Sequence, residues 1–349
     1  MPTHRIPARY QWPILLAIMA VSLALALGFF GDFHPALDAF AQLRLHLAVL
    51  LALVALPLLF TPLRLEAVAA LVFSVAALST TYAALRIPGL SPVQAGFVAD
   101  EGDHAVYRLL QLNLRFDNPA PEKVLSLIGR AQPDVVTLEE VSPMWKDKLD
   151  LLANAYPHRI VCSSPHGSSG VAILSRRPFA ADSEPVCYTG GTLAVASVDF
   201  GGTPVDVAAL HLGWPWPFAR GGQMSKMAIP LSTLGSTAVV AGDCNAVPWS
   251  ATVRQLASAG GLMPLPSVGP TWQYIKLPEL LRFTGLPIDQ VFSKGAVLIH
   301  SAARLEPVGS DHLPVMVQFS LRPQPGPSEG EGATALASTG PELAINATR

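Results

Sequence analysis

Charged side chains are scarce in this sequence. They make up 14% of its 349 residues, whereas soluble globular proteins carry about 25%, so an ordinary water-soluble surface along the whole chain is excluded. The net charge is −2, and residues 104–321 hold equal numbers of acidic and basic side chains. Composition therefore gives no sign of the basic surface that nucleic-acid binding requires, and nucleic acid is not favoured as a partner.

Cysteine is also rare, and none of the three cysteines has a neighbour at the close spacing of a zinc or redox motif. Cys162 and Cys187 can pair in an oxidising compartment or remain two buried thiols, and the sequence leaves both possibilities open. For Cys244 we expect a small buried side chain.

Long apolar runs open the chain, at residues 12–30, 45–60 and 67–85. A membrane-spanning helix needs about 20 mostly apolar residues, so the first and third runs are long enough, and the second is long enough if it begins near Ala41. A cleaved signal peptide is the alternative for the first run. Because two more runs follow at short spacing, we predict a membrane anchor of three transmembrane helices over residues 1–86.

The positive charges that flank these runs predict the orientation of the anchor. Arg5 and Arg9 precede the first run without an acidic neighbour, and Arg64 lies in the short loop before the third run. Because cytoplasmic loops are enriched in Lys and Arg, we expect a cytoplasmic N-terminus and an extracytoplasmic segment after residue 85, in a bacterial inner or plasma membrane. Three short-looped helices with no central charge argue against a transport pathway.

An α/β domain is predicted for residues 105–321. Runs rich in Val, Leu and Ala alternate with helical stretches and suit strands buried between other layers. We expect strands at 106–114, 134–141, 170–176, 193–200, 205–212 and 237–245, and helices at 121–131 and 223–234. Residues 87–104 are expected to form a linker, and residues 322–349, rich in Pro, Gly and Ser, a disordered tail.

Polar side chains interrupt or end six apolar runs of this domain. Burying such groups costs several kcal/mol unless they are paired. Each has an ordinary explanation when it stands alone, such as a cap or a turn, but six in one domain indicate a functional site. The residues are Asn113, Glu139 with Glu140, His211, Asp243 with Asn245, Asp289, and Asp311 with His312.

These residue types favour one kind of chemistry. Asn, Asp and Glu provide hard oxygen ligands, which suit Mg²⁺, with Mn²⁺ or Ca²⁺ as alternatives, more than zinc. Two histidines beside several carboxylates suit phosphate-ester hydrolysis, in which one His–Asp pair activates water and a second His protonates the leaving oxygen.

The motifs LQLNL, DVVTLEEV, SGVAILSR, ALHL, AGDCNAVPWS, PIDQV and GSDHLPV occur in this order over the whole predicted domain. The series resembles that of the endonuclease/exonuclease/phosphatase superfamily, and Gly-Asp-x-Asn and Ser-Asp-His are its most specific parts. The resemblance implies a four-layer α/β sandwich, in which two packed β-sheets are flanked by helices. It also implies Mg²⁺-dependent hydrolysis of a phosphate ester by direct attack of water.

The resemblance also assigns the metal-binding residues. Glu140 matches the metal-binding Glu of a Leu-Gln-Glu-Val string, in which Glu139 here occupies the Gln position. Asn113 matches an Asn beside the metal, and Asp311 matches a second carboxylate on the metal side.

The catalytic residues follow from the same resemblance. Asp243 and Asn245 match the pair that orients the nucleophilic water and the phosphate. His312 matches the His that acts as base or binds the phosphoryl oxygen, and Asp289 matches the Asp that orients this His. His211 matches the other His, which is the general acid in the deoxyribonuclease-like and phosphatase-like branches.

Departures from the family pattern guide the choice of substrate. Ser168 stands where apurinic-site endonucleases carry a Tyr, and those enzymes also lack a His at position 211. Together with the neutral domain charge, this favours a lipid-like or small phosphodiester, or a phosphomonoester, outside the cytoplasm. An extracytoplasmic nuclease acting on DNA or RNA is the alternative. A non-catalytic binding module is a further one, but its mark, a lost metal or base residue, is absent. The predicted partners are this substrate and the lipid bilayer, and no protein partner is predicted.

An aromatic segment, Trp214 to Phe218, follows His211 directly. Its Pro-spaced aromatics can pack a rigid turn, which we favour slightly, or they can line the substrate cleft or touch the bilayer surface.

Overall fold

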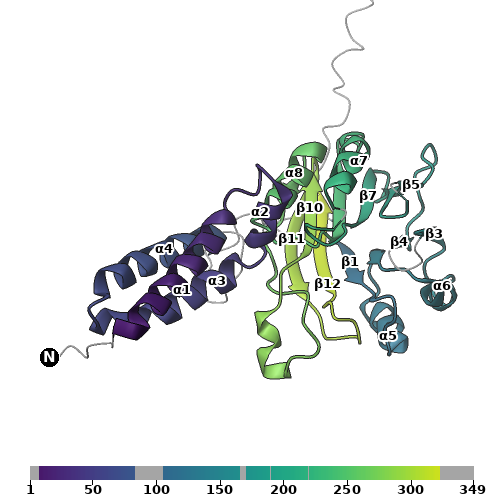
Figure 1. Ribbon diagram of the computed structural model, residues 1–349. Helices are drawn as coiled ribbons and strands as arrows, with labels where there is room; N and C mark the ends of the chain where they lie inside the picture. Colours follow the sequence, from purple (N-terminus) through teal and green to yellow (C-terminus); the bar gives the residue numbers. More distant parts are fainter. Residues whose placement is uncertain (1–7, 83–104, 166–169, 189, 219, 323–349) are drawn as a thin grey trace, which may run out of the picture.

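The computed structural model describes residues 8–82, 105–165, 170–188, 190–218 and 220–322. The expected linker at 87–104 and, apart from its first residue, the expected tail at 322–349 lie outside these ranges. Figure 1 shows two parts, a bundle of helices formed by the N-terminal segment and an α/β sandwich beside it.

The N-terminal bundle consists of α1 (Ala8–Leu27), α2 (Pro35–Ala41), α3 (Arg44–Ala55), η1 (Leu56–Phe60) and α4 (Arg64–Tyr82). Two of these helices, α1 and α4, are long and apolar enough to cross a membrane, and a third span would have to combine α2 with α3 and η1 across a bend of 58°. The run expected as one helix at 45–60 is therefore divided. Pro57 explains the change at Ala55, because proline has no N–H for the α-helical ladder and the chain continues as a 3₁₀ turn.

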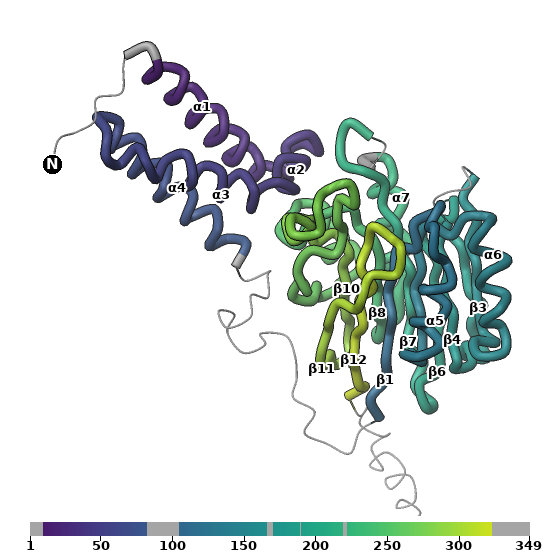
Figure 2. The backbone as a smooth tube through the Cα atoms, turned by 90° about the horizontal axis from the view of Figure 1, so that it is seen from below, coloured from purple at the N-terminus to yellow at the C-terminus, as the bar shows by residue number. Residues whose placement is uncertain are grey.

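Arg44 connects α1, α3 and α4 at the ends of these helices that lie nearest to the sandwich. Its guanidinium donates to the carbonyl of Gly28, just after α1, at 2.7 Å and to Oγ1 of Thr80 in α4 at 3.5 Å. The ends of α1 and α4 therefore meet the start of α3. Figure 2 shows the bundle projecting from one side of the sandwich, with α2 between the two parts.

Two six-stranded sheets form the sandwich. The first has the order β11-β12-β1-β2-β4-β3 and the second the order β5-β6-β7-β8-β10-β9. The first contains β1 (Tyr107–Asn113), β2 (Val135–Glu139), β3 (His158–Cys162), β4 (Val171–Ser175), β11 (Val297–Arg304) and β12 (Val315–Leu321). The second contains β5 (Val186–Tyr188), β6 (Leu193–Asp199), β7 (Pro204–His211), β8 (Ala238–Asp243), β9 (Met263–Pro264) and β10 (Asp289–Lys294).

Successive strand residues face different cores, because side chains alternate across a strand. Leu109 belongs to the core between the sheets, whereas Leu110 packs under α5 (Pro121–Ala131) and α6 (Pro143–Asp150). In the second sheet, Val240 packs under α7 (Arg220–Ser232) and α8 (Ala251–Gly260). Two packed mixed sheets flanked by helices confirm the predicted α/β sandwich.

The short helix α2 binds the sandwich at the start of α8. Oδ1 of Asp38 accepts from Ala251 N at 2.7 Å, and Oδ2 accepts from Thr252 N at 3.2 Å and from Thr252 Oγ1 at 2.7 Å. Trp249 Nε1 donates to Ala41 O at 2.8 Å, and Val247 N donates to Oε1 of Gln42 at 3.0 Å. A buried carboxylate thus receives the unpaired N–H groups of a helix N-terminus, and the bundle is fixed to the sandwich.

A disulfide bond joins Cys162 of β3 to Cys187 of β5. These strands belong to different sheets, so the bond ties the two sheets together. It decides between the alternatives that the sequence left open, and Cys244 is buried as expected.

Candidate active site

The topology gathers the polar ends of strands from both sheets. Each sheet contains a parallel pair, β1 with β2 and β7 with β8, and parallel strands end at the same edge. Asn113 lies opposite Glu139 in the first sheet, whereas His211 and Asp289 flank Asp243 on the two neighbouring strands of the second. Asn113 of the first sheet donates a hydrogen bond to Asp243 of the second, so the two edges lie side by side.

His312 and Asp289 form a buried ion pair. His312 Nδ1 lies 2.8 Å from Oδ2 of Asp289. Burial opposes a charged imidazole, but the carboxylates of Asp289 and Asp243 outweigh it and raise the pKa of His312 to about 10. Burial likewise opposes ionisation of Asp289, and the imidazolium of His312 outweighs it and lowers the pKa of Asp289. The pair is therefore charged at neutral pH, with Asp289 fixing the ring.

Asp243 lies between the two histidines. Its Oδ2 is 3.7 Å from Nε2 of His312 and 3.7 Å from Nε2 of His211. Asn245 N donates to its Oδ1 at 2.7 Å, and the Asn245 side chain donates to Leu212 O at 2.8 Å. Burial raises the pKa of Asp243 to about 6, against the lowering effect of His312. A carboxylate that titrates near neutral pH can exchange a proton with water.

Asn113 connects Glu140 to this group. Its Nδ2 donates to Oε1 of Glu140 at 3.2 Å and to Oδ2 of Asp243 at 3.0 Å, and its Oδ1 accepts from Arg115 N at 2.9 Å. The second oxygen of Glu140 accepts from Phe116 N at 2.9 Å. Asn113 thus orients two carboxylates, and its role as a metal ligand stays a prediction.

Three residues at this edge have left-handed backbone conformations although none is glycine. The φ angles are +59° at Arg115, +55° at Glu140 and +45° at Asn245. Such conformations are sparsely populated and cluster at functional sites. Each of the three residues lies one or two positions after the end of a strand. The left-handed conformations therefore occur where the chain leaves the sheets beside the site.

Asp311 and His312 lie in the loop before β12. Oδ2 of Asp311 accepts from Trp272 Nε1 at 3.2 Å. Ser310 fixes the loop, because its Oγ donates to Asn113 O at 2.7 Å and accepts from His312 N at 3.0 Å. The structure therefore brings all eight predicted site residues to one edge of the sandwich.

Two kinds of carboxylate occur at this edge. Among the described residues, Asp243, Asp289 and His312 have potential ligand atoms within 4.8 Å of one another. Asp289 already accepts from Gln111 and His312, and Asp243 from Asn113 and Asn245. Glu140 and Asp311 are instead partly exposed. The buried trio is thus a hydrogen-bonded charge network. Glu140 and Asp311 are the predicted ligands that solvent reaches, and their role as hard oxygen ligands stays a prediction.

Sequence reasoning missed several residues that support the site. Gln111 Nε2 donates to Oε2 of Glu139 at 2.9 Å and to Oδ1 of Asp289 at 2.8 Å, and Thr271 Oγ1 accepts from Asp289 N at 3.2 Å. Arg115 is near enough to Asp311 and Glu140 for both to raise its pKa, after its partner Asp117. Gln111 carried a signal, since it is a polar residue inside a buried strand, whereas Thr271 and Arg115 lie in loops that show no periodicity.

The aromatic segment after His211 borders the site. Trp214, Trp216 and Phe218 are 51%, 51% and 65% exposed, so these side chains are not buried, and the role of the segment stays a prediction. The Trp214 ring meets the edge of Trp272, with ring centroids 6.0 Å apart, and Trp272 is the residue that binds Asp311. Trp214 is therefore connected through Trp272 to Asp311, one of the predicted metal ligands.

Two packed sheets with carboxylates and histidines gathered at one edge are what the family resemblance predicts for a phosphate-ester hydrolase. The model of the Endonuclease/Exonuclease/phosphatase family matches residues 110–312, and the chain belongs to this family. The match contains every predicted site residue.

Solved structures share the fold. An endonuclease/exonuclease/phosphatase from Beutenbergia cavernae is 22% identical, with a TM-score of 0.50, over 62% of this chain and 72% of that one. A family member from Bacteroides vulgatus is 15% identical, with a TM-score of 0.53, over 62% and 100%. TDP2 of D. rerio, complexed with a single-strand DNA product, is 20% identical, with a TM-score of 0.52, over 62% and 99%. No curated protein matches the chain.

Proposed function

We propose that this protein is a membrane-anchored, Mg²⁺-dependent phosphoesterase. It hydrolyses a phosphodiester or phosphomonoester by attack of water, without a covalent enzyme intermediate. The observation that carries the proposal is the continuous set of contacts from Asp289 through His312 and Asp243 to Asn113 and Glu140. It combines a charged His–Asp pair, a carboxylate that titrates near neutral pH and accessible hard oxygen ligands.

The donor set fits a hard divalent cation. Glu140 and Asp311 would hold Mg²⁺, with Asn113 keeping Glu140 in place, and Mn²⁺ or Ca²⁺ would fit the same oxygen atoms. When bound, the ion neutralises charge on the phosphoryl group and polarises its oxygen atoms.

The protein's own residues divide the remaining work. Asp243, whose pKa is about 6, orients the attacking water and accepts its proton, and Asn245 holds the Asp243 carboxylate in position for the water and the phosphate. The pKa of about 10 at His312 supports its role as a cation on the phosphoryl group, held there by Asp289. His211, on the other side of Asp243, donates a proton to the leaving oxygen.

A lipid-like or small phosphodiester is the proposed substrate. The domain carries no excess of basic residues, which a nuclease uses to neutralise phosphates. Exposed aromatic side chains beside the site suit an amphiphilic substrate, because Trp is favoured at the bilayer surface.

The proposed topology has three crossings and an extracytoplasmic catalytic domain. Arg44 joins the ends of α1, α3 and α4, and α2 fixes these ends to the sandwich. The N-terminus and the turn between η1 and α4 then lie on the opposite side of the bilayer, with the positive charges of Arg5, Arg9 and Arg64. The disulfide bond between Cys162 and Cys187 supports an oxidising compartment.

Hydrolysis by the full-length protein in nanodiscs tests the proposal. The substrates are bis-p-nitrophenyl phosphate, p-nitrophenyl phosphate, plasmid DNA and a phospholipid panel, each with Mg²⁺ and with a chelator. The full chain is required because α2 contacts the segment after Asn245. We expect turnover that the chelator and Glu140→Ala or His312→Ala abolish, with matched controls Glu122→Ala and His158→Ala remaining active. Preference for DNA would support the nuclease alternative, and no metal-dependent turnover on any substrate would contradict the proposal.

A further inference from the structure

The loop that carries η2 (Glu279–Thr284) lies beside the end of the bundle that faces the sandwich. His46 of α3 approaches Thr284 O at 2.6 Å through its Nε2, and Leu45 and Leu286 pack against the same buried apolar cluster. In Figure 1, η2 is the short light-green helix at the bottom of the sandwich. If α1, α3 and α4 cross a bilayer, this loop is at the level of its surface.

Apolar side chains of this loop are exposed. Leu280, Leu281 and Phe283 are 83%, 43% and 69% exposed, and Tyr274 and Ile275 add to the same loop. Adjacent exposed apolar side chains mark an interaction surface. Lys276, Arg282 and one acidic residue, Glu279, lie among them, and exposed apolar and aromatic groups with a net basic charge are typical of segments that lie in the bilayer surface.

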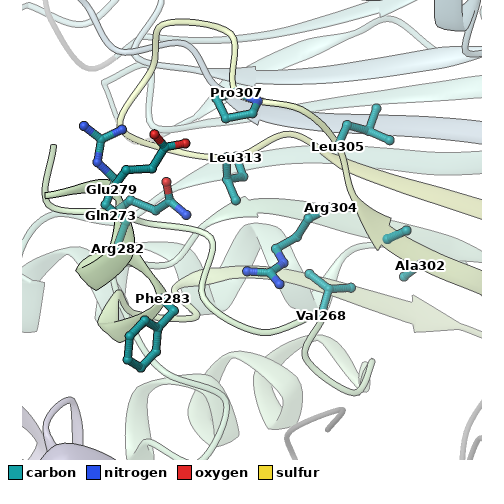
Figure 3. Close-up of a pocket in the computed structure, with 11 residues that line it drawn as sticks. Val268, Gln273, Glu279, Arg282, Phe283, Ala302, Arg304, Leu305, Pro307 and Leu313 are labelled. Carbon is teal, nitrogen blue, oxygen red and sulfur yellow. The ribbon is translucent and has the colours of Figure 1, made fainter. Parts of the chain in front are cut away.

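A cavity of about 650 Å³ opens behind η2, between this helix and the end of β11. Its polar lining residues are Gln273, Glu279, Arg282 and Arg304, and Val268 and Leu305 are among its apolar ones. Figure 3 shows the Arg304 guanidinium directed into the cavity from β11, toward the side formed by Gln273 and Glu279. Two arginines against one glutamate give the lining a net positive charge.

Arg304 is suited to bind an anion there. Its Nη1 donates to Pro270 O at 2.7 Å, which fixes the guanidinium, and the side chain stays accessible to a ligand from solvent. Guanidinium groups bind phosphate through paired, charge-assisted hydrogen bonds.

We propose that the η2 loop rests in the bilayer surface and that the cavity behind it binds the headgroup of an anionic phospholipid. Arg304 contacts the phosphate, and Leu280 and Phe283 lie among the acyl chains. This lipid site is distinct from the active site, because none of the eight predicted site residues lines the cavity. The inference rests on the proposed membrane anchoring and not on the proposed hydrolysis.

Nitroxide labels on the full-length protein in nanodiscs test the position of the loop. Labels at Leu280→Cys, Met19→Cys of α1 and Leu151→Cys are compared by their accessibility to oxygen and to a water-soluble nickel complex. Leu151, at the end of α6, is 72% exposed and is the matched aqueous control. We expect the Leu280 and Met19 labels to be immersed and the Leu151 label to be in water. A Met19 label in the bilayer with a Leu280 label in water would overturn the proposed position of the η2 loop but not the membrane anchoring. Met19 and Leu280 labels that are both in water would overturn the membrane anchoring as well.

Native mass spectrometry tests the headgroup site, with phosphatidylglycerol and phosphatidylcholine as probes. We expect Arg304→Gln to bind phosphatidylglycerol roughly tenfold more weakly than the wild type, because the variant loses about one charge-assisted hydrogen bond to the phosphate. Arg304→Lys, which keeps the charge, should lose less. The control Arg130→Gln removes an exposed arginine of α5 that pairs with Glu306 and should bind as the wild type does. Unchanged binding by a folded Arg304→Gln variant, or equal binding of both lipids by the wild type, would contradict the proposal.

Discussion

The buried ion pair of His312 with Asp289 controls the charge at the centre of the site. Asp289→Asn keeps the shape of the side chain but removes the charge that raises the pKa of His312. We expect that pKa to fall and kcat to drop by roughly 10²–10⁴, the usual range for a lost acid–base group. Histidine NMR titration and steady-state kinetics measure the two effects. The control Asp199→Asn alters a carboxylate that accepts from the loop N–H of Gly202, and an equal loss there would contradict the assignment.

Glu139 is a buried carboxylic acid behind the site. Burial, followed by the charge of Asp289, raises the pKa of Glu139 well above its ordinary value of 4.5. The folded protein therefore binds this proton more tightly than the unfolded chain does. Above pH 4.5, this preference lowers the free energy of unfolding progressively until the pH passes the folded-state pKa.

Glu139→Gln should consequently stabilise the protein at pH 8, in buffer with a chelator. Gln is neutral at every pH, and its oxygen can still accept from Gln111. We expect Tm to rise at pH 8, by about 2–4 °C for each kcal/mol gained, and the difference from the wild type to shrink as the pH falls toward 4.5. Thermal unfolding at several pH values measures this, and a gain that does not change with pH would show that ionisation of Glu139 is not its cause.

At the residue scale, the sequence predicted the side chains that end strands and missed those that support them. Asp243 and His312 were visible because a carboxylate and an imidazole follow buried apolar runs, where they are costly unless they are used. Trp272 and Thr271 were not visible, because single polar or aromatic residues in loops have many ordinary explanations. Their importance depends on tertiary contacts, namely Trp272 with Asp311 and Thr271 with Asp289.

At the element scale, buried contacts of Asp38 fix α2 to the sandwich. Asp38→Ala leaves three donors of Ala251 and Thr252 without their acceptor, so we expect a loss of about 1–3 kcal/mol of stability. We also expect a lower kcat, because the loosened segment follows Asn245. Thermal unfolding and kinetics of the full-length protein measure both effects.

The control for this prediction is Asp32→Ala. Asp32 forms an exposed ion pair with Arg254 of the same helix, and such pairs contribute little. Both variants remove one negative charge from the interface between the bundle and α8. The carboxylate that is removed is buried at Asp38 and exposed at Asp32. Equal effects would show that the buried contacts of Asp38 have no special importance.

Elements with strong patterns were predicted well, and those defined by tertiary contacts were not. The expected strands at 106–114 and 237–245 correspond to β1 and β8, and the expected helix at 121–131 coincides with α5. β9 has two residues and β5 has three, which is too short for any period to be visible. α2 was not among the predicted helices, because it has seven residues and because the contacts of Asp38 with α8 are tertiary.

At the scale of the whole molecule, the disulfide bond holds the two sheets together. Its loop spans 25 residues, so the loop-closure argument gives about 3 kcal/mol of stabilisation relative to the reduced chain. We expect Cys162→Ser with Cys187→Ser to lower Tm and reductant to lower Tm of the wild type but not of the double variant. A wild-type protein whose Tm is unaffected by complete reduction would contradict this contribution.

The bundle and the sandwich together predict the topology of the chain. If the proposed anchor crosses a bilayer, the sandwich and the α1–α3 connection lie on the same side of it, because Arg44 joins the ends of α1, α3 and α4 and α2 binds α8. The η1–α4 turn then lies on the other side. We expect alkaline phosphatase, which is active only outside the cytoplasm, to be active when fused after Leu321 and inactive when fused after Phe60. A cytoplasmic reporter at the same two positions should give the opposite result. Two active phosphatase fusions would mean that α4 does not cross the bilayer, and the chain would then be held by α1 alone.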